Sequence, residues 1–273
     1  MAHCGTWPIG VCSWSLQREL PDLIDAMRQL GIDHVHLDIG PACRPDGRTY
    51  LEQVRRINWT ISATMIGFAQ EDYSTLETIK KTGGIVPDEC WDINRQRFLT
   101  AIEATAALGV PYLSSHFGFL DLSDPACAGK LIQRVRLLAD VAAERNVMVL
   151  METGQERADE LKTFLQTLNH PALGVNLDPA NMILYNKGNP IEGVRTLAPW
   201  VRHIHIKDAI RADQPGTWGQ EVVWATGQVD ADNFLKTLHE INYSGVLAIE
   251  REAGNDRFGD IKTAVERLKA FTA

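Results

Sequence analysis

The sequence predicts one α/β domain over residues 1–273, in which strands and helices alternate and close into a (β/α)8 (TIM) barrel. Short apolar runs rich in β-branched residues alternate with amphipathic stretches along the whole chain, which is typical of a parallel sheet. The chain has eight such runs, the number of strands that closes a barrel of roughly 250 residues. An open doubly wound sheet is the alternative, but no G-x-G-x-x-G turn follows the first run.

Each predicted strand is short, and a helical pattern or a long loop follows it. The predicted strands are Ile9–Trp14, His34–Ile39, Trp59–Ile66, Tyr112–His116, Val147–Glu152, Leu173–Asp178, Val201–Ile206 and Gly245–Glu250. Between them, stretches such as Ser123–Arg145 and Asp230–Ile241 place apolar side chains on one helix face. Two long loops, Gly67–Trp91 and Lys207–Val229, follow the third and seventh strands. Because barrel enzymes build their sites at the carboxyl ends of the strands, we expect these loops to be lids.

The composition indicates a cytoplasmic protein that acts on small molecules. Hydrophobic residues make up 45% of the 273 residues and charged residues 23%, as in ordinary globular proteins. The five cysteines are scattered, which fits reduced thiols better than a disulfide framework. We see no secretory signal and no run of ~20 apolar residues that would span a membrane. The net charge of −8 argues against nucleic acid as a partner.

Four predicted strands in the second half of the chain end in a residue that can bind a cation. These residues are Glu152, Asp178, His205 and Glu250. One such residue alone is more often a helix cap or half of an ion pair. Four at the same end of neighbouring strands would repel one another unless a cation lay among them. Three carboxylates and an imidazole therefore predict one divalent metal ion, Mn²⁺, Mg²⁺, Co²⁺ or Zn²⁺, with the oxygen-rich set favouring Mn²⁺ or Mg²⁺.

Strand alternation predicts further polar residues inside the barrel. His203 lies two residues before His205 and so shares its face. We interpret His203 as a hydrogen-bonded neighbour of the site. The apolar residues of the second strand should face the outer helices, which turns His34, His36 and Asp38 inward. We expect the two histidines there to be buried partners of Asp38 or of water.

The four predicted ligands lie in the motifs METGQE, NLDPAN, HIHIKD and AIERE. With these motifs the chain resembles the xylose isomerase-like TIM-barrel superfamily over nearly its whole length. That superfamily holds sugar-phosphate isomerases, ketose 3-epimerases, inosose dehydratases and endonuclease IV, and its members are often dimers or tetramers. The resemblance implies that Glu152, Asp178, His205 and Glu250 bind one divalent ion. It also implies that Glu152 and Glu250 flank the substrate carbon and transfer protons, and it allows a homo-oligomer.

The resemblance further implies a set of substrate contacts. Arg211, six residues after the metal-binding histidine, stands where ketose epimerases contact substrate, and Glu156 and His116 lie where other members do. The epimerases have a substrate-contacting histidine three residues after the metal aspartate. This chain has Asn181 there, so the identity of the substrate is open.

Two cations and three tryptophans each have more than one interpretation from the sequence. Lys207 and Arg211 could neutralise developing charge, bind a substrate phosphate, or be solvated surface cations. Trp14, like Trp218 and Trp224, could stack on a sugar ring or simply close the pocket.

These residues predict a carbohydrate isomerase or epimerase. A divalent cation can stabilise the negative charge that develops on a keto sugar when the proton beside its carbonyl leaves. A glutamate can take that proton to give an ene-diolate, and return of a proton to another carbon or another face gives an isomer or an epimer. A metal-dependent dehydratase of a keto-inositol or related keto acid is the alternative, because it begins with the same proton abstraction and then expels a hydroxyl.

Two further alternatives are less well supported. An endonuclease of the endonuclease IV type needs three metals, a histidine where Asn181 stands, and an Asp-x-His pair that this chain lacks. A sugar-binding protein without activity would have no need for the paired bases Glu152 and Glu250.

Overall fold

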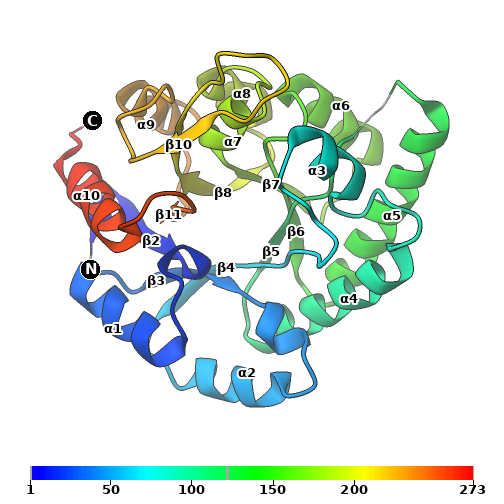
Figure 1. Cartoon of the computed structure of the whole chain (residues 1–273). Coiled ribbons are helices and arrows are strands. Elements are labelled where there is room, and N and C mark those ends of the chain that lie inside the picture. Colours follow the sequence, from blue (N-terminus) through cyan, green and yellow to red (C-terminus); the bar gives the residue numbers. More distant parts are fainter. Residues whose placement is uncertain (1, 121–122, 273) are drawn as a thin grey trace.

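The computed structural model of the chain describes residues 2–120 and 123–272, and a closed parallel barrel forms its centre (Figure 1). Among the described residues, eight parallel strands pair side by side. In sheet order these are β2 (Trp7–Cys12), β3 (His34–Asp38), β4 (Thr60–Met65), β5 (Tyr112–Ser115), β6 (Met148–Glu152), β7 (Leu173–Leu177), β8 (Val201–Ile206) and β11 (Leu247–Ile249). Because β11 also pairs with β2, the sheet closes on itself. The predicted (β/α)8 barrel is confirmed.

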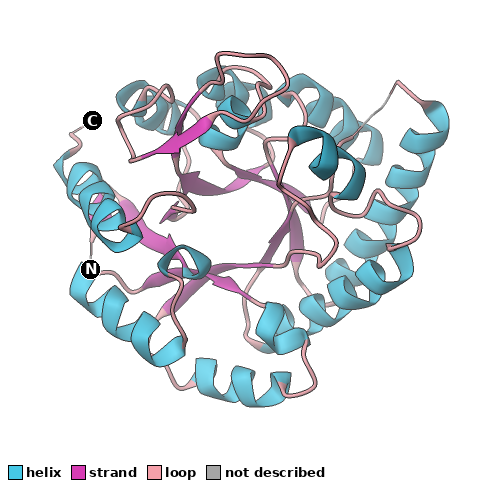
Figure 2. Cartoon of the chain, viewed as in Figure 1, coloured by secondary structure: helices cyan, strands magenta, loops and turns pink. Residues whose placement is uncertain are grey.

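Helices surround the barrel, as Figure 2 shows. They are α1 (Leu20–Leu30), α2 (Gly47–Arg55), α3 (Leu76–Thr82), α4 (Trp91–Ala107), α5 (Pro125–Glu144), α6 (Ala158–Leu168), α7 (Pro179–Leu184), α8 (Pro190–Leu197), α9 (Ala231–Glu240) and α10 (Arg257–Ala270). Their apolar stripes face the sheet. In α1, for example, Leu23, Met27 and Leu30 are buried, and the helix ends at Gly31 in the left-handed conformation that glycine adopts without cost.

The observed strands follow the predicted ones with two informative differences. The first strand begins earlier than predicted, at Trp7, and ends at Cys12. Residues 13–16 form a 3₁₀ turn, η1 (Ser13–Leu16), so Trp14 leaves the strand. A second such turn, η2 (Gly40–Cys43), follows β3. The last strand is shorter than predicted, and Glu250 comes directly after it. The other strands differ from prediction by at most one residue at either end.

The sequence did not predict three short strands. β1 (His3–Cys4) pairs antiparallel with β2 at the beginning of the chain. β9 (Asp208–Ile210) and β10 (Gln220–Val222) form a separate antiparallel hairpin within the long loop that follows β8. The other long loop, after β4, contains α3.

The two long loops meet over one end of the barrel (Figure 1). The indole Nε1 of Trp218, in the β9–β10 hairpin, donates a hydrogen bond of 3.1 Å to the backbone oxygen of Tyr73, in the loop before α3. The Trp218 ring also meets the ring of Tyr185 edge to face, with centroids 4.8 Å apart. Segments that are far apart in the sequence are therefore in contact at the carboxyl ends of the strands.

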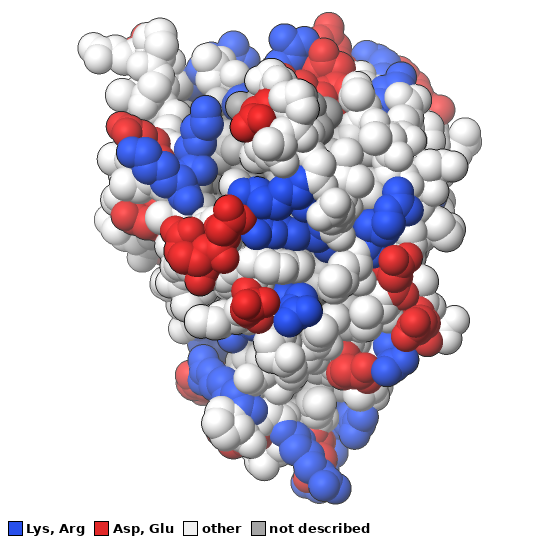
Figure 3. Space-filling model, turned by 90° about the vertical axis from the view of Figure 1, so that its right-hand side faces the viewer, with Lys and Arg blue, Asp and Glu red and all other residues white. Residues whose placement is uncertain are grey.

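The outer surface carries charges of both signs. Figure 3 shows the flank on the right of Figure 1, where α4, α5 and α6 lie, and acidic and basic side chains are interspersed on it. Among the helices within residues 2–120 and 123–272, none has an apolar stretch that would span a bilayer.

Candidate metal centre and active site

The four residues predicted to bind a metal meet at one point in the barrel mouth. The Nδ1 atom of His205 lies 3.3 Å from Glu152 Oε1, 3.4 Å from Asp178 Oδ2 and 3.3 Å from Glu250 Oε2. One donor atom from each of the four residues lies within 4.8 Å of the others, and all four side chains are buried. They come from the adjacent strands β6, β7, β8 and β11, whose carboxyl ends share one edge of the barrel.

Local sequence orients the aspartate of this cluster. Asp178 directly follows β7 and is the N-cap of α7, and Pro179 occupies the first position of the helix. Its Oδ1 accepts a hydrogen bond of 2.9 Å from the backbone N–H of Asn181. Because Oδ1 is held by the helix, Oδ2 points to the other ligands.

The donor set fits a divalent cation. Within the described part of the chain, the buried atoms Asp178 Oδ2 and His205 Nδ1 have no hydrogen-bond partner, an arrangement that is costly unless something else binds them. Burial raises the pKa of Asp178 to about 6, against the opposing effect of Lys207. Three carboxylate oxygens and one imidazole nitrogen are ligands that Mn²⁺, Mg²⁺ and related ions accept. The cluster could therefore hold one such ion.

Lys207 is buried beside the cluster, and it is not a solvated surface cation. Its side chain is 3% exposed, and its Nζ lies 2.9 Å from Glu250 Oε2 and 2.8 Å from Glu252 Oε2. Burial alone would raise the pKa of Glu250, but Lys207 and then His205 outweigh that effect and hold it well below its ordinary value. Glu250 is therefore ionised and available as a ligand at neutral pH.

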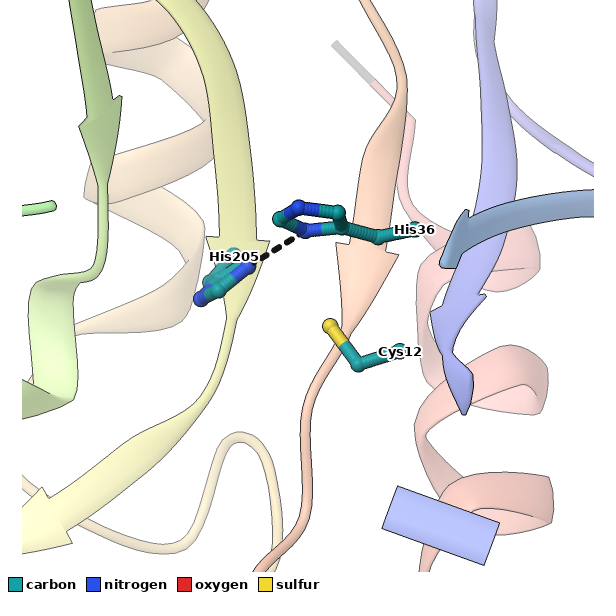
Figure 4. A group of neighbouring side chains, drawn as sticks. All are labelled: Cys12, His36 and His205. Atoms are coloured by element: carbon teal, nitrogen blue, oxygen red, sulfur yellow. Dashed lines mark hydrogen bonds between the residues drawn. The ribbon is translucent and has the colours of Figure 1, made fainter. Parts of the chain in front are cut away.

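A second group of buried side chains lies next to His205 (Figure 4). His36 Nδ1 lies 2.9 Å from His205 Nε2. Cys12 on β2 and His36 on β3 are opposite each other in the sheet register. One potential ligand atom from each of Cys12, His36 and His205 lies within 4.8 Å of the other two. Burial lowers the pKa of His36 to about 3 and raises that of Cys12 to about 12. Both side chains are therefore neutral.

His34 and His36 were expected to be buried partners of Asp38 or of water, and neither histidine pairs with Asp38. His36 bonds His205, while His34 Nδ1 lies 2.9 Å from Asp33 Oδ1. Asp38 instead accepts a hydrogen bond from the backbone N–H of Gly40 in η2. The alternation was read correctly, because His36 is buried inside the barrel. The partners differ because the closed barrel brings β8 opposite β3.

His203 is hydrogen-bonded one layer deeper, as expected. Its Nδ1 lies 3.0 Å from Asn176 Oδ1, and its Nε2 lies 2.9 Å from Ser62 Oγ. Asn176 Nδ2 in turn lies 3.1 Å from His205 Nε2. The sequence analysis did not single out Asn176, although its position two residues before Asp178 puts it on the same face of β7.

A cavity of about 560 Å³ opens above the cluster. Four of the predicted substrate contacts line it: Trp14, His116, Asn181 and Lys207. Glu250 lines it as well, and the indole Nε1 of Trp14 donates a hydrogen bond of 2.7 Å to Glu250 Oε1.

Glu152 lies just beneath the cavity wall. Asn181 Nδ2 donates a hydrogen bond of 3.2 Å to Glu152 Oε1, and His116 Nε2 lies 3.5 Å from the same oxygen. The Glu152 side chain is only 1% exposed. Glu250 therefore lines the cavity directly, whereas Glu152 lies behind His116 and Asn181, which line it.

The structure does not bring the other two predicted contacts into this cavity. Glu156 is buried in the loop between β6 and α6, where burial raises its pKa to about 8. Arg211 lines a neighbouring surface hollow, and Tyr185 lies between that hollow and the cavity. Of the two other tryptophans, Trp218 lines the cavity, and Trp224 is buried in the core against Phe234.

Asp38, which strand alternation turned inward, also lines the cavity. The sequence analysis did not single out the other residues that line it, which are Met65, Gly67, Glu71, Tyr73, Leu184, Tyr185, Glu221 and Glu252. Most belong to loops or to α7, where no alternation marks the side that faces the site. Glu252, two residues after Glu250, could have been found by its spacing.

The chain matches the model of the xylose isomerase-like TIM barrel family over residues 25–271, and it belongs to that family. A solved structure, a xylose isomerase domain protein from Planctomyces limnophilus, is 34% identical, covers 96% of each chain and superposes with a TM-score of 0.87.

Curated relatives that carry the name of an enzyme include a dehydratase and an epimerase. A 3-dehydroshikimate dehydratase of Bacillus anthracis is 33% identical over 86 residues, which is 30% of this chain and 30% of that protein. A ketose 3-epimerase of Arthrobacter globiformis is 28% identical over 159 residues, which is 56% of this chain and 51% of that protein. The matches thus span from less than a third to about half the length of these relatives.

Proposed function

We propose that this protein is a divalent-metal-dependent isomerase or epimerase that removes the proton next to the carbonyl of a keto sugar. The observation that carries the proposal is the meeting of Glu152, Asp178, His205 and Glu250 beneath a cavity of about 560 Å³. A cavity of this size suits a small molecule. The similarity to a ketose 3-epimerase supports the same reaction class.

The side chains divide the work of the reaction. A divalent ion held by the four ligands would supply a Lewis acid for the negative charge that develops on the substrate oxygens. Glu250, which lines the cavity, accepts the proton beside the carbonyl and leaves an ene-diolate. Trp14 holds Glu250 Oε1 in place through its indole N–H. Glu152 ends β6, whereas Glu250 follows β11, so the two glutamates come from different sides of the ligand group. Glu152 is the second base, which epimerisation needs in order to return a proton to the opposite face of the substrate carbon.

A dehydratase is the second candidate, supported by the similarity to 3-dehydroshikimate dehydratase. Dehydration of a keto-inositol or a related compound begins with the same proton abstraction. It then breaks the bond to a hydroxyl on the next carbon, and that hydroxyl leaves as water. The product loses the mass of one water, whereas an isomer or epimer keeps the substrate mass.

The test is solvent-deuterium exchange, measured by mass spectrometry, on keto sugars, keto-inositols and their phosphates with added Mn²⁺. We expect one compound to take up deuterium, and both Glu250→Gln and Glu152→Gln to stop this exchange. Bound Mn²⁺ is measured in parallel, because either change also replaces a ligand. Glu240→Gln, at an exposed ion pair with Arg195, is the matched control.

Two results would overturn the proposal. One is the absence of exchange with every compound in Mn²⁺-loaded protein. The other is an unchanged exchange rate in a Glu250→Gln variant that still holds the metal.

We also propose that the protein works in the cytoplasm as a single domain. The five cysteines are free thiols, which supports a reducing compartment.

A further inference from the structure

The wall of the cavity is rich in carboxyl groups. Five acidic residues line it: Asp38, Glu71, Glu221, Glu250 and Glu252. Among the described residues that line it, Lys207 is the one lysine or arginine. Its ammonium group is already in contact with Glu250 and Glu252. The described wall therefore offers no free lysine or arginine to an anionic group.

A bound metal ion does not reverse this balance. The three ligand carboxylates outweigh a divalent ion by one negative charge. The charge of Lys207 is neutralised by Glu252, whose Oε2 lies 2.8 Å from the lysine Nζ. The charge of Glu221 is neutralised by Arg251, whose guanidinium lies 2.7 Å from Glu221 Oε1. Even with one positive charge on His116, the net charge of the metal-loaded cavity wall would be zero and not positive. Asp38 and Glu71, in either protonation state, add no positive charge.

The N-terminus of α7 is not a free anion site at the cavity either. A helix N-terminus can bind a phosphate or carboxylate through its free N–H groups, and α7 begins beside the cavity, where Asn181 lies. The side chain of Asp178 already caps this helix by accepting from the N–H of Asn181. An anion here would meet a carboxylate instead of free donors.

The remaining wall suits a neutral sugar. Four aromatic residues line the cavity: Trp14, Tyr73, Tyr185 and Trp218. Aromatic faces pack against the C–H faces of sugar rings, and carboxylates accept hydrogen bonds from hydroxyl groups, which cost less to desolvate than a charged group. A phosphate or carboxylate, in contrast, calls for a cationic partner such as arginine.

The surface hollow beyond Tyr185 has no excess of basic residues among the described residues that line it. Basic and acidic residues line it in equal number: Lys80, Arg157, Lys187 and Arg211, and Glu77, Asp159, Glu192 and Asp213. Arg157 is already paired with Asp159 at 2.7 Å.

We infer that the substrate is a neutral polyhydroxy ketone, an unphosphorylated keto sugar or keto-inositol, and not a sugar phosphate or a keto acid. This inference rests on the proposed function and narrows it. It selects one substrate class for a site whose relatives' names include both a ketose enzyme and a dehydroshikimate enzyme.

The test compares matched substrates in Mn²⁺-loaded protein. Each keto sugar is paired with its terminal phosphate, and a keto-inositol is paired with a ring keto acid of similar size. We expect kcat/KM for deuterium exchange to be at least about 100-fold higher for the neutral member, since juxtaposed like charges cost several kcal/mol. An anionic member that exchanges as fast or faster overturns this inference and leaves the proposed function standing. No exchange with any compound overturns both.

A variant tests whether the wall charge is the cause. Glu252 is half-exposed, and Glu252→Gln removes one of the two carboxylates that hold Lys207. We expect the preference for the neutral member to fall about tenfold, because Lys207 becomes available to an anion. The control Glu240→Gln should leave the preference unchanged. An unchanged preference in Glu252→Gln would contradict the role of the wall charge.

Discussion

The Nδ1 atom of His36 lies 2.9 Å from the Nε2 atom of His205 (Figure 4). His205 turns its other nitrogen toward three carboxylates, so a cation bound there leaves the ring proton on Nε2. The neutral His36 ring can accept that proton in a hydrogen bond. A hydrogen bond of this kind fixes the tautomer and the orientation of a metal-binding histidine.

We therefore expect His36→Leu to weaken Mn²⁺ binding about 10- to 100-fold, the usual effect of removing such a partner. Isothermal titration calorimetry measures the affinity, and thermal unfolding without metal shows whether the variant is folded. His36→Gln, which keeps an acceptor, should recover part of the loss. His34→Gln changes the same strand at a residue that bonds Asp33 instead, and it should leave the affinity unchanged. Equal affinity in the leucine variant would show that His36 only fills space.

Trp218 joins the two long loops over the cavity by its hydrogen bond to Tyr73 and its contact with Tyr185. We expect Trp218→Ala to raise KM for the exchanging sugar about tenfold, since the bound sugar loses its cover against water. Mn²⁺ affinity should not change, because Trp218 contacts none of the four ligands. Trp218→Phe keeps an aromatic ring but loses the N–H donor, and its KM should lie between those of the unmutated protein and the alanine variant. An unchanged KM in the alanine variant would contradict a covering role.

Gly154 lets the loop after Glu152 pass close to α7. Its φ is +146°, and a Cβ at this position would lie 2.6 Å from Asn181 Cβ and 3.2 Å from the ring of Tyr185. We expect Gly154→Ala to lower the free energy of unfolding by about 1–3 kcal/mol and to weaken sugar binding, because Asn181 and Tyr185 line the cavity. Urea unfolding measures the first effect and KM the second.

The matched control for this change is Gly129→Ala in α5, where a Cβ would meet nothing within 4 Å. Alanine there should raise the stability by about 0.5–1 kcal/mol, because glycine is unfavourable inside a helix. Equal effects of the two changes would show that Gly154 is not constrained by α7.

Glu156 makes stability depend on pH. Burial raises its pKa from 4.5 to about 8, so between these values the folded protein holds a proton that the unfolded chain releases. The contribution of Glu156 to the free energy of unfolding is therefore fully present below pH 4.5 and is lost as the pH rises toward 8. The free energy of unfolding falls by at most about 1.4 kcal/mol per pH unit over this range. Glu156→Gln should unfold like the unmutated protein near pH 4.5 and be more stable at pH 8.

Urea unfolding at the two pH values measures this difference. Glu266→Gln, at an exposed position of α10, is the control and should not change the pH dependence. If the difference in free energy of unfolding between Glu156→Gln and the unmutated protein stayed constant with pH, Glu156 would not be the source of this pH dependence.

The sequence predicted the barrel and the four candidate ligands for the same physical reason. A strand buried on both faces is largely apolar, so the eight strands are visible as predominantly apolar runs. A polar residue at the end of such a run is conspicuous, as with Glu152 and Asp178. Parallel strands also bring their carboxyl ends to one edge. The order of the elements alone therefore indicated that these residues would meet.

The rest of the site depended on tertiary structure. Trp14 and Glu250 are 236 residues apart, and their hydrogen bond exists because β11 closes the barrel onto β2. Lys207 could be a surface cation or a buried one until the fold placed Glu250 and Glu252 around it. The sequence alone determined which residues are ionisable, and which strand carries or directly precedes each of the four candidate ligands. Only the closed barrel decided which charges meet, because contacts between distant segments depend on packing that no local pattern records.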